Sequence, residues 1–198
     1  MKILYMIPTM GKGGAEDIIV SLANANSKNS FVTLFLLRRC DGDNYNLSRL
    51  SKNINVIHFE DCCNQKWLNT LKPLSSFYKI FKSFQIFFTK DFYQFDIIHS
   101  NLTLSSALAS AYQFFSLLPK YNKPKYIETF HTNFHLIGFS RLVIFIIGWN
   151  LRHKLVYEIN EPEKIKIKRV LLNKKKLFYI PFSAESHREL NIKPIYES

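Results

Sequence analysis

The sequence predicts a Rossmann-like α/β fold, in which a mostly parallel sheet lies between two layers of helices and forms a three-layer sandwich. Three observations support this prediction. Segments typical of strands and of helices alternate along all 198 residues, which is the pattern of a parallel sheet with crossover helices. The run 31–37 is almost wholly apolar, as expected of a strand covered on both faces. A glycine-rich loop joins the first expected strand to the first expected helix.

The N-terminal part of the chain supplies the first three strands. Residues 2–8 form a short apolar run that a proline ends, and they predict a buried first strand. Residues 15–26 place apolar side chains at helical spacing, so a helix is expected there. The run 31–37 is the second strand, and a short third strand is expected at 55–59, after a loop at 41–44.

The rest of the chain continues the alternation. Helices are expected at 74–89, 102–117 and 138–152, and a last one begins at Asn160, which can cap it. Further strands are expected at 96–100, 125–131, 154–159 and 177–182. The sequence therefore predicts seven strands. It predicts one domain over residues 1–198, because no linker rich in Gly, Pro or Ser divides the chain.

Charge and cysteine content limit the partners and the compartment that we expect. Lys and Arg total 27 against 15 Asp and Glu, a formal net charge of +12 that favours anionic partners. Three cysteines without metal-ligand spacing predict neither disulfides nor a zinc site, and they fit a reducing cytoplasm. The longest apolar run, 142–149, is far shorter than the roughly 20 residues that span a bilayer. The N-terminus lacks the pattern of a signal peptide, so a cytoplasmic protein is expected.

The loop after the first strand reads Ile-Pro-Thr-Met-Gly-Lys-Gly-Gly-Ala-Glu, with its glycines at Gly11, Gly13 and Gly14. Glycines let the backbone approach a ligand closely, and the N–H groups that open the following helix attract anions. The loop therefore predicts a phosphate site, and the alternative is a tight turn that needs positive φ. The dinucleotide fingerprint fails because Glu16 stands where Gly or Ala is required. The Walker motif fails because Gly13, rather than Ser or Thr, follows Lys12.

The opening stretch, residues 1–26, resembles the start of the N-terminal domain of glycosyltransferase family four, whose loop ends in Gly-Gly-Ala-Glu. Three later segments are similar to strands of that family and come in the same order: DIIHS at 96–100, ETFHT at 128–132 and LFYIPF at 177–182. The resemblance covers the whole chain. It implies one half of a GT-B fold, namely the acceptor-binding half of a retaining glycosyltransferase, with the donor-binding domain absent from these residues.

The resemblance also implies a set of site residues. His131 would contact the transferred sugar or the diphosphate and is the candidate catalytic residue, although a histidine there could instead bond only to a local carbonyl. The loop glycines, Gly11, Gly13 and Gly14, would touch the donor diphosphate. Candidate substrate-binding residues are Glu16, His99, Ser100 and Asn101.

The same resemblance implies the substrates. The sugar would come from a nucleotide sugar and pass to a glycan or a lipid-linked acceptor in cell-surface polysaccharide synthesis. Helix N-termini and cationic side chains would stabilise the departing phosphate, so no metal and no cofactor is expected.

Departures from the family pattern leave other functions open. The hinge motif Pro-Asn-Gly-Val-Asp is replaced by Pro-Phe-Ser-Ala-Glu, and Asn101 stands in place of a second histidine. Glu189 and Glu197 have the spacing of the family's donor-site glutamates, which we treat as a coincidence. One alternative is a non-catalytic sugar- or nucleotide-binding module, or a subunit that pairs with a separate donor-binding chain. Another is an NADP-dependent oxidoreductase, because Arg38 and Arg39 end the second strand, where a 2′-phosphate could bind.

An aromatic and basic segment, residues 77–88, is expected to form an amphipathic helix. The side chains expected to pack against the sheet are Phe77, Ile80, Phe81, Phe84 and Phe88. The opposite face would carry Lys79, Lys82 and Lys90, with Ile86 among them. That face is either solvated or rests on anionic lipid, which would make the protein peripheral on the inner face of the membrane. Nucleic acid is not expected as a partner, because the aromatic residues near these cations face the core.

Overall fold

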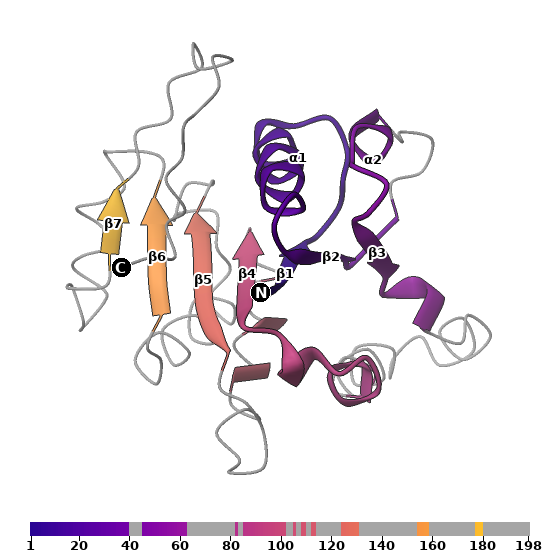
Figure 1. Cartoon of the computed structure of the whole chain (residues 1–198), viewed down its shortest axis with the longest axis vertical. Helices are drawn as coiled ribbons and strands as arrows, with labels where there is room; N and C mark the ends of the chain where they lie inside the picture. The colour runs from indigo at the N-terminus through magenta and orange to yellow at the C-terminus, as the bar shows by residue number, and fades with distance from the viewer. Residues whose placement is uncertain are drawn as a thin grey trace, which may run out of the picture.

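The computed structural model describes residues 1–39, 45–62, 82, 85–101, 105, 108–109, 112–113, 124–130, 154–158 and 177–179. They contain a seven-stranded sheet in the order β3-β2-β1-β4-β5-β6-β7, and every neighbouring pair of strands is parallel (Figure 1). The strands are β1 (Lys2–Ile7), β2 (Phe31–Leu36), β3 (Asn55–His58), β4 (Ile97–Asn101), β5 (Lys125–Phe130), β6 (Lys154–Glu158) and β7 (Leu177–Tyr179). All seven expected strands are present, so the prediction of a Rossmann-like α/β fold is confirmed.

Helices cover the sheet on both faces. Helix α1 (Gly14–Asn26) lies over one face, next to the short helix α2 (Tyr45–Ser48) (Figure 1). One turn of 3-10 helix, η1 (Glu60–Cys62), follows β3, and another, η3 (Phe92–Gln94), precedes β4. Helical residues 85–89 pack on the opposite face. Among the described residues, no helix is both long and apolar enough to cross a bilayer.

The core on the α1 side is built from alternate residues of the central strands. Ile3, Tyr5 and Ile7 of β1 belong to it, because successive strand side chains point to opposite faces. Helix α1 contributes Ile19, Val20 and Ala23, which follow one another at helical spacing. The amide Nδ2 of Asn26, in the last turn of α1, donates to the Tyr5 hydroxyl at 2.8 Å, so a buried phenol is satisfied by the helix above it.

The core on the other face is rich in aromatic residues. The rings of Phe87 and Tyr112 stack with centroids 4.7 Å apart, and Phe35 meets Phe92 edge to face at 5.1 Å. Burial raises the pKa of the Tyr112 phenol well above its usual value, with Cys62 and Tyr126 adding to the effect.

The position of Ile86 differs from the one expected from the sequence. Ile86 is only 2% exposed and belongs to this core, as does Phe87, whereas the sequence placed Ile86 on the outer, cationic face. The ammonium of Lys82 donates to Oε1 of Gln85 at 2.8 Å, and Lys90 is exposed. The other residues of the predicted faces, Phe77, Lys79, Ile80, Phe81 and Phe84, lie outside the described residues.

The strand order changes direction at β1. From β1 the chain adds β2 and then β3 on one side, and it returns to add β4 on the other side. In an open parallel sheet, ligands bind outside the carboxyl ends of the strands at such a switch point. The carboxyl ends of β1 and β4 are therefore where a sheet of this kind is expected to bind a ligand.

Candidate functional site

The glycine loop occupies the carboxyl end of β1, between Ile7 and the start of α1 at Gly14. Met6 is in register with Ser100, so the loop begins beside the point at which β4 ends in Asn101. Three of the predicted elements, the loop glycines, Ser100 and Asn101, thus meet at the same edge of the sheet on two adjacent strands. Their roles in binding stay predictions.

The two glycines that open α1 have different surroundings. Gly13 is the N-cap, with extended backbone at φ −171° and ψ 155°, and its carbonyl accepts from the N–H of Asp17 at 3.0 Å. A methyl group at Gly13 would overlap the carboxylate of Glu16, whereas at Gly14 it would meet nothing within 4 Å. Neither Gly13 nor Gly14 adopts positive φ, so a turn that needs positive φ is not formed at these two glycines. Gly13 leaves room for a carboxylate at the helix N-terminus, and Gly14 faces open space.

A hydrogen bond from α2 holds the loop. Asn46 is completely buried, and its Nδ2 donates to the carbonyl oxygen of Gly11 at 2.6 Å. Its Oδ1 accepts from Nη1 of Arg49 at 2.8 Å, and Arg49 also forms an ion pair with Asp17 in the first turn of α1. The loop, α1 and α2 are therefore joined by one chain of polar contacts.

Two cations share one aromatic ring beside the loop. The ammonium of Lys12 lies 5.6 Å from the centre of the Tyr45 ring, and the guanidinium of Arg49 lies 5.1 Å from it. Tyr45 is half exposed, so both cations remain in contact with solvent. The positive charges of Lys12 and Arg49 are therefore held on the α2 side of the loop.

Polar side chains gather where β4 and β5 end. Ser100, Asn101, Ser105 and Glu128 are each completely buried. The Ser100 hydroxyl donates to the carbonyl oxygen of Ile127 at 3.4 Å, and the Ser105 hydroxyl donates to the carbonyl oxygen of Asn101. Buried polar groups are normally hydrogen-bonded, and two of these four form the bonds just described.

His99 lies two residues before the end of β4. Its ring is 4% exposed and contacts the Tyr5 ring at 5.3 Å, and its Nε2 shares a hydrogen bond with Oγ1 of Thr129 at 2.7 Å. The structure thus places His99 within the α1-side core of the sheet, and a substrate contact by this residue remains a prediction. The candidate catalytic residue, His131, directly follows β5 and lies outside the described residues.

Of the two arginines after β2, Arg39 is arranged unfavourably for a 2′-phosphate. The guanidinium of Arg39 pairs with Asp61, and the backbone N–H of Arg39 donates to Oε2 of Glu60 at 3.4 Å. Two carboxylates next to the strand end would repel a phosphate that approached it. Arg38 is exposed, and no ion pair of its own is present within the described residues.

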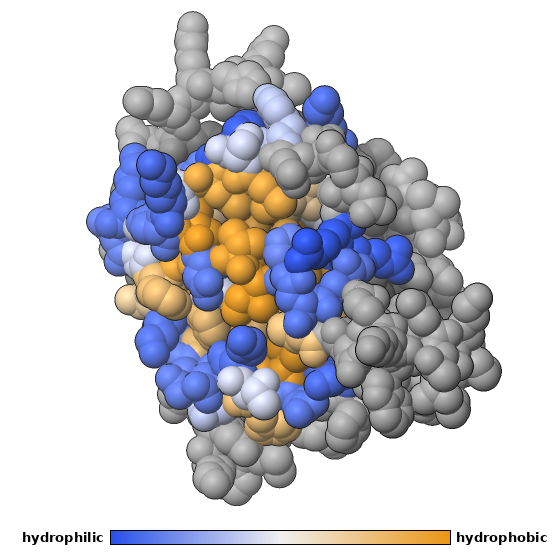
Figure 2. All heavy atoms as spheres, turned by 90° about the vertical axis from the view of Figure 1, so that its right-hand side faces the viewer, coloured by the Kyte–Doolittle hydropathy of each residue, from blue (hydrophilic) through white to orange (hydrophobic). Residues whose placement is uncertain are grey.

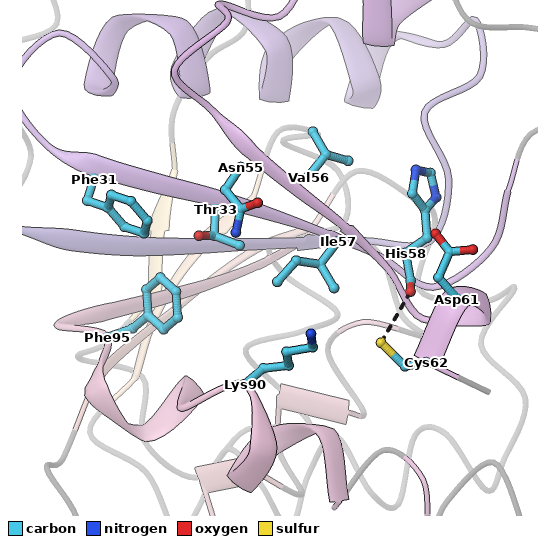
Figure 3. Close-up of a pocket in the computed structure, with 10 residues that line it drawn as sticks. All are labelled: Phe31, Thr33, Asn55, Val56, Ile57, His58, Asp61, Cys62, Lys90 and Phe95. Atoms are coloured by element: carbon cyan, nitrogen blue, oxygen red, sulfur yellow. Dashed lines mark hydrogen bonds between the residues drawn. The ribbon is translucent and has the colours of Figure 1, made fainter.

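A separate hollow of about 530 Å³ lies under the free edge of the sheet. Lys90 and Phe95 face Ile57 on the side of the sheet away from α1 (Figure 3). Apolar side chains also reach the surface between polar ones when the molecule is seen from the β3 side (Figure 2). Two buried polar atoms among its lining residues, Thr33 Oγ1 and His58 Nδ1, have no hydrogen-bond partner within the described part of the chain. Of the residues predicted for the sugar site, none that the structure describes lines this hollow.

Two residues of the site were not expected from the sequence. Asn46 lies in a polar stretch after a loop, where nothing in the sequence marks it as a partner of Gly11, 35 positions earlier. Glu128 could have been found, because a carboxylate in a strand that lies between two others is costly to bury unless it is paired. Among the described residues, no cluster of three or more His, Cys, Asp or Glu is arranged to hold a metal ion.

Comparison with known proteins yields likenesses of structure. No family of known sequences and no curated protein matches the chain. HepE of Anabaena, crystallised with UDP and glucose, superposes with a TM-score of 0.63 over 91% of this chain and 44% of its own, at 14% identity. WaaB, a lipopolysaccharide outer core galactosyltransferase, gives a TM-score of 0.61 over 94% of this chain and 47% of its own, at 16% identity.

A structure of sucrose-phosphate synthase from Thermosynechococcus elongatus gives a TM-score of 0.57 at 15% identity, over 93% of this chain and 91% of that one. The chain therefore spans less than half the length of HepE and WaaB. At these identities the likeness is one of fold, and the chain has the Rossmann-like α/β fold that these GT-B glycosyltransferases contain.

Proposed function

We propose that this chain is the acceptor-side half of a retaining glycosyltransferase that moves a sugar from a nucleotide sugar to a glycan or lipid-linked acceptor in cell-surface polysaccharide synthesis. The observation that carries the proposal is the position of the glycine loop at the switch point between β1 and β4. A glycine-rich loop that leads into a helix at that place suits the phosphates of a nucleotide sugar. Supporting it, HepE has been crystallised with UDP-glucose, and its fold matches over 91% of this chain.

In the proposed reaction the bond between the sugar and the diphosphate of the donor breaks. Negative charge develops on the departing phosphate oxygens, and N–H donors aimed at those oxygens stabilise the transition state. Gly13 and Gly14 would supply such donors from this half. His131 would contact the transferred sugar from the end of β5, and Ser100 and Asn101 would line the acceptor cleft.

Most of the donor site would lie in a second domain, on the same polypeptide or on a separate chain. The isolated chain should then bind a nucleotide weakly and transfer sugar far more slowly than about 1 per second, a typical enzymatic rate. Closure of both halves positions donor and acceptor, and positioning supplies several kcal/mol of the barrier.

The experiment is a titration of the ¹⁵N-labelled chain with UDP, UDP-glucose and NADP, followed through the amide signals of Lys12, Gly13 and Gly14. We expect these three signals to move with UDP and UDP-glucose. Gly14→Ala should fold like the parent and weaken the response, because the methyl group enters the open space that the ligand would use. If the three amides ignore both uridine nucleotides the proposal is wrong, and a response to NADP alone would favour the oxidoreductase.

A further inference from the structure

We propose that Asn46 is a positioning residue that fixes the plane of the peptide between Gly11 and Lys12, and that the Lys12 N–H aimed in this way donates to the anionic ligand of the glycine loop. This inference rests on the proposed function and deepens it, because it names a donor and the residue that presents that donor. Asn46 belongs to α2 and reaches the loop through the carbonyl of Gly11.

The plane of the peptide between Gly11 and Lys12 is set from α2. Glycine tolerates many backbone conformations, so Gly11 alone would leave the following peptide free to rotate. The 2.6 Å hydrogen bond from Asn46 Nδ2 holds the Gly11 carbonyl toward α2. The C=O and N–H of a trans peptide point in opposite directions, so the Lys12 N–H is directed away from α2. Within the described residues, no group accepts a hydrogen bond from this N–H.

The side-chain amide of Asn46 is itself held in one orientation. An amide that turned over would present its oxygen to the Gly11 carbonyl and lose the hydrogen bond. Arg49 prevents this, because its Nη1 donates to Asn46 Oδ1 at 2.8 Å and a guanidinium can only donate. Arg49 is itself held by the ion pair with Asp17 and by the Tyr45 ring. The orientation of the loop peptide is therefore tied to the first turn of α1.

The ammonium of Lys12 lies over the Tyr45 ring, on the α2 side of the loop, whereas the backbone N–H of Lys12 points away from α2. Lys12 therefore serves the ligand through its backbone. Together with the N–H groups of Gly13 and Gly14 it offers consecutive main-chain donors, an arrangement that suits the several acceptor oxygens of a diphosphate.

The test is Asn46→Asp, which keeps the size of the side chain and the contact with Arg49. A carboxylate repels the Gly11 carbonyl and attracts the Lys12 N–H, so the peptide should turn over. In the ligand-free protein we expect the Lys12 amide signal to shift and its hydrogen exchange to slow. The matched control is Asn24→Asp, because Nδ2 of Asn24 donates to the Arg49 carbonyl at 2.9 Å and its Oδ1 accepts from the Ser51 N–H at 2.8 Å. That control adds the same charge and breaks the same kind of bond between α1 and the α2 region, but it does not touch the loop.

With UDP as the probe, Asn46→Asp should weaken binding by about ten- to hundredfold, the loss expected for one hydrogen bond to a charged group. The control should stay within about twofold of the parent. The loss should persist at about 0.5 M salt, where an effect of added charge alone is largely screened. Parental affinity, or a loss that salt abolishes, overturns the proposal.

The proposed function and the role of Asn46 can fail separately. If the parent does not bind UDP, the proposed function fails, and the Lys12 amide in the ligand-free protein still decides whether Asn46 fixes the peptide. If Asn46→Asp does not fold, Arg49→Met on the surface replaces it. Freeing the Asn46 amide should then broaden or split the Lys12 signal, and an unchanged single signal with parental UDP affinity would sink the idea.

Discussion

His99 and Thr129 are joined side chain to side chain, with Nε2 and Oγ1 2.7 Å apart, across two neighbouring strands that bury both of them. The hydrogen bond links β4 to β5 on the face that α1 covers, and Tyr5 of β1 contacts the same imidazole ring. Three strands are thus connected through one histidine just below the edge at which the predicted site lies.

Thr129→Val should lower the free energy of unfolding by about 1 to 3 kcal/mol, because it leaves a buried ring nitrogen without this partner. Thr33→Val is the matched control. Thr33 is 1% exposed, and its Oγ1 has no hydrogen-bond partner among the described residues, so the same substitution should be neutral or stabilising. Urea unfolding of the two variants measures the difference, and equal losses would show that the hydrogen bond contributes nothing.

Gly13→Ala should destabilise the chain through Glu16. The extended backbone at Gly13 is open to alanine, but the new methyl group must displace the Glu16 carboxylate from the start of α1. The lost interaction with the helix N-terminus is worth about 0.3 to 1 kcal/mol. In a Glu16→Ala background only the poorer N-cap preference of alanine should remain, so the loss should be smaller, and a double-mutant cycle by thermal unfolding measures the coupling. Additive effects of the two changes would contradict the overlap.

Tyr112 should make the protein sensitive to alkaline pH. Its pKa is raised in the folded state, so the phenol stays protonated there while the unfolded chain ionises near its ordinary value of about 10. The contribution of Tyr112 is therefore complete below about pH 10 and is lost as pH rises toward the folded pKa, by about 1.4 kcal/mol per pH unit. Tyr112→Phe should remove that part of the slope between about pH 9.5 and 11. The same slope in both proteins would show that other groups cause it.

The basic helix should bind anionic vesicles if it rests on lipid. Each lysine near such a surface is worth about 1 kcal/mol, so changing Lys79, Lys82 and Lys90 to glutamine should reduce partitioning about a hundredfold at low salt. Three exposed lysines elsewhere, Lys28, Lys52 and Lys125, provide a control with the same change in net charge. Vesicle co-sedimentation of both triple variants separates a specific face from overall charge. Equal losses, or a parent that ignores the vesicles, would mean that the face is solvated.

The architecture was predictable because its signals are local. Apolar runs bounded by polar residues mark each of the seven strands, and strand bounds moved by only a few residues; the third strand, for example, ends at His58 instead of residue 59. The glycine loop was predictable for the same reason, since its three glycines stand together between a strand and a helix.

The contacts that hold the loop were not predictable, because they depend on residues far apart in the sequence. Asn46 and Gly11 meet only after β2 has returned the chain to the same edge, and a four-residue helix has too few turns to show a periodic pattern. Ile86 was misplaced for a related reason. The helical period allowed more than one choice of buried face, and the aromatic core that fixes the choice includes Phe92 and Tyr112 from later segments.

The position of β1 in the middle of the sheet sets the order in which this chain can fold during synthesis. Its first neighbour, β2, follows within 36 residues, whereas its second neighbour, β4, starts only at residue 97. During synthesis β1, β2 and β3 are made before β4, so one edge of β1 has no neighbour until β4 is made, and such an edge can pair with another extended segment. Slow translation between residues 60 and 97 should prolong this exposure and promote aggregation, whereas the completed sheet has β1 covered on both sides.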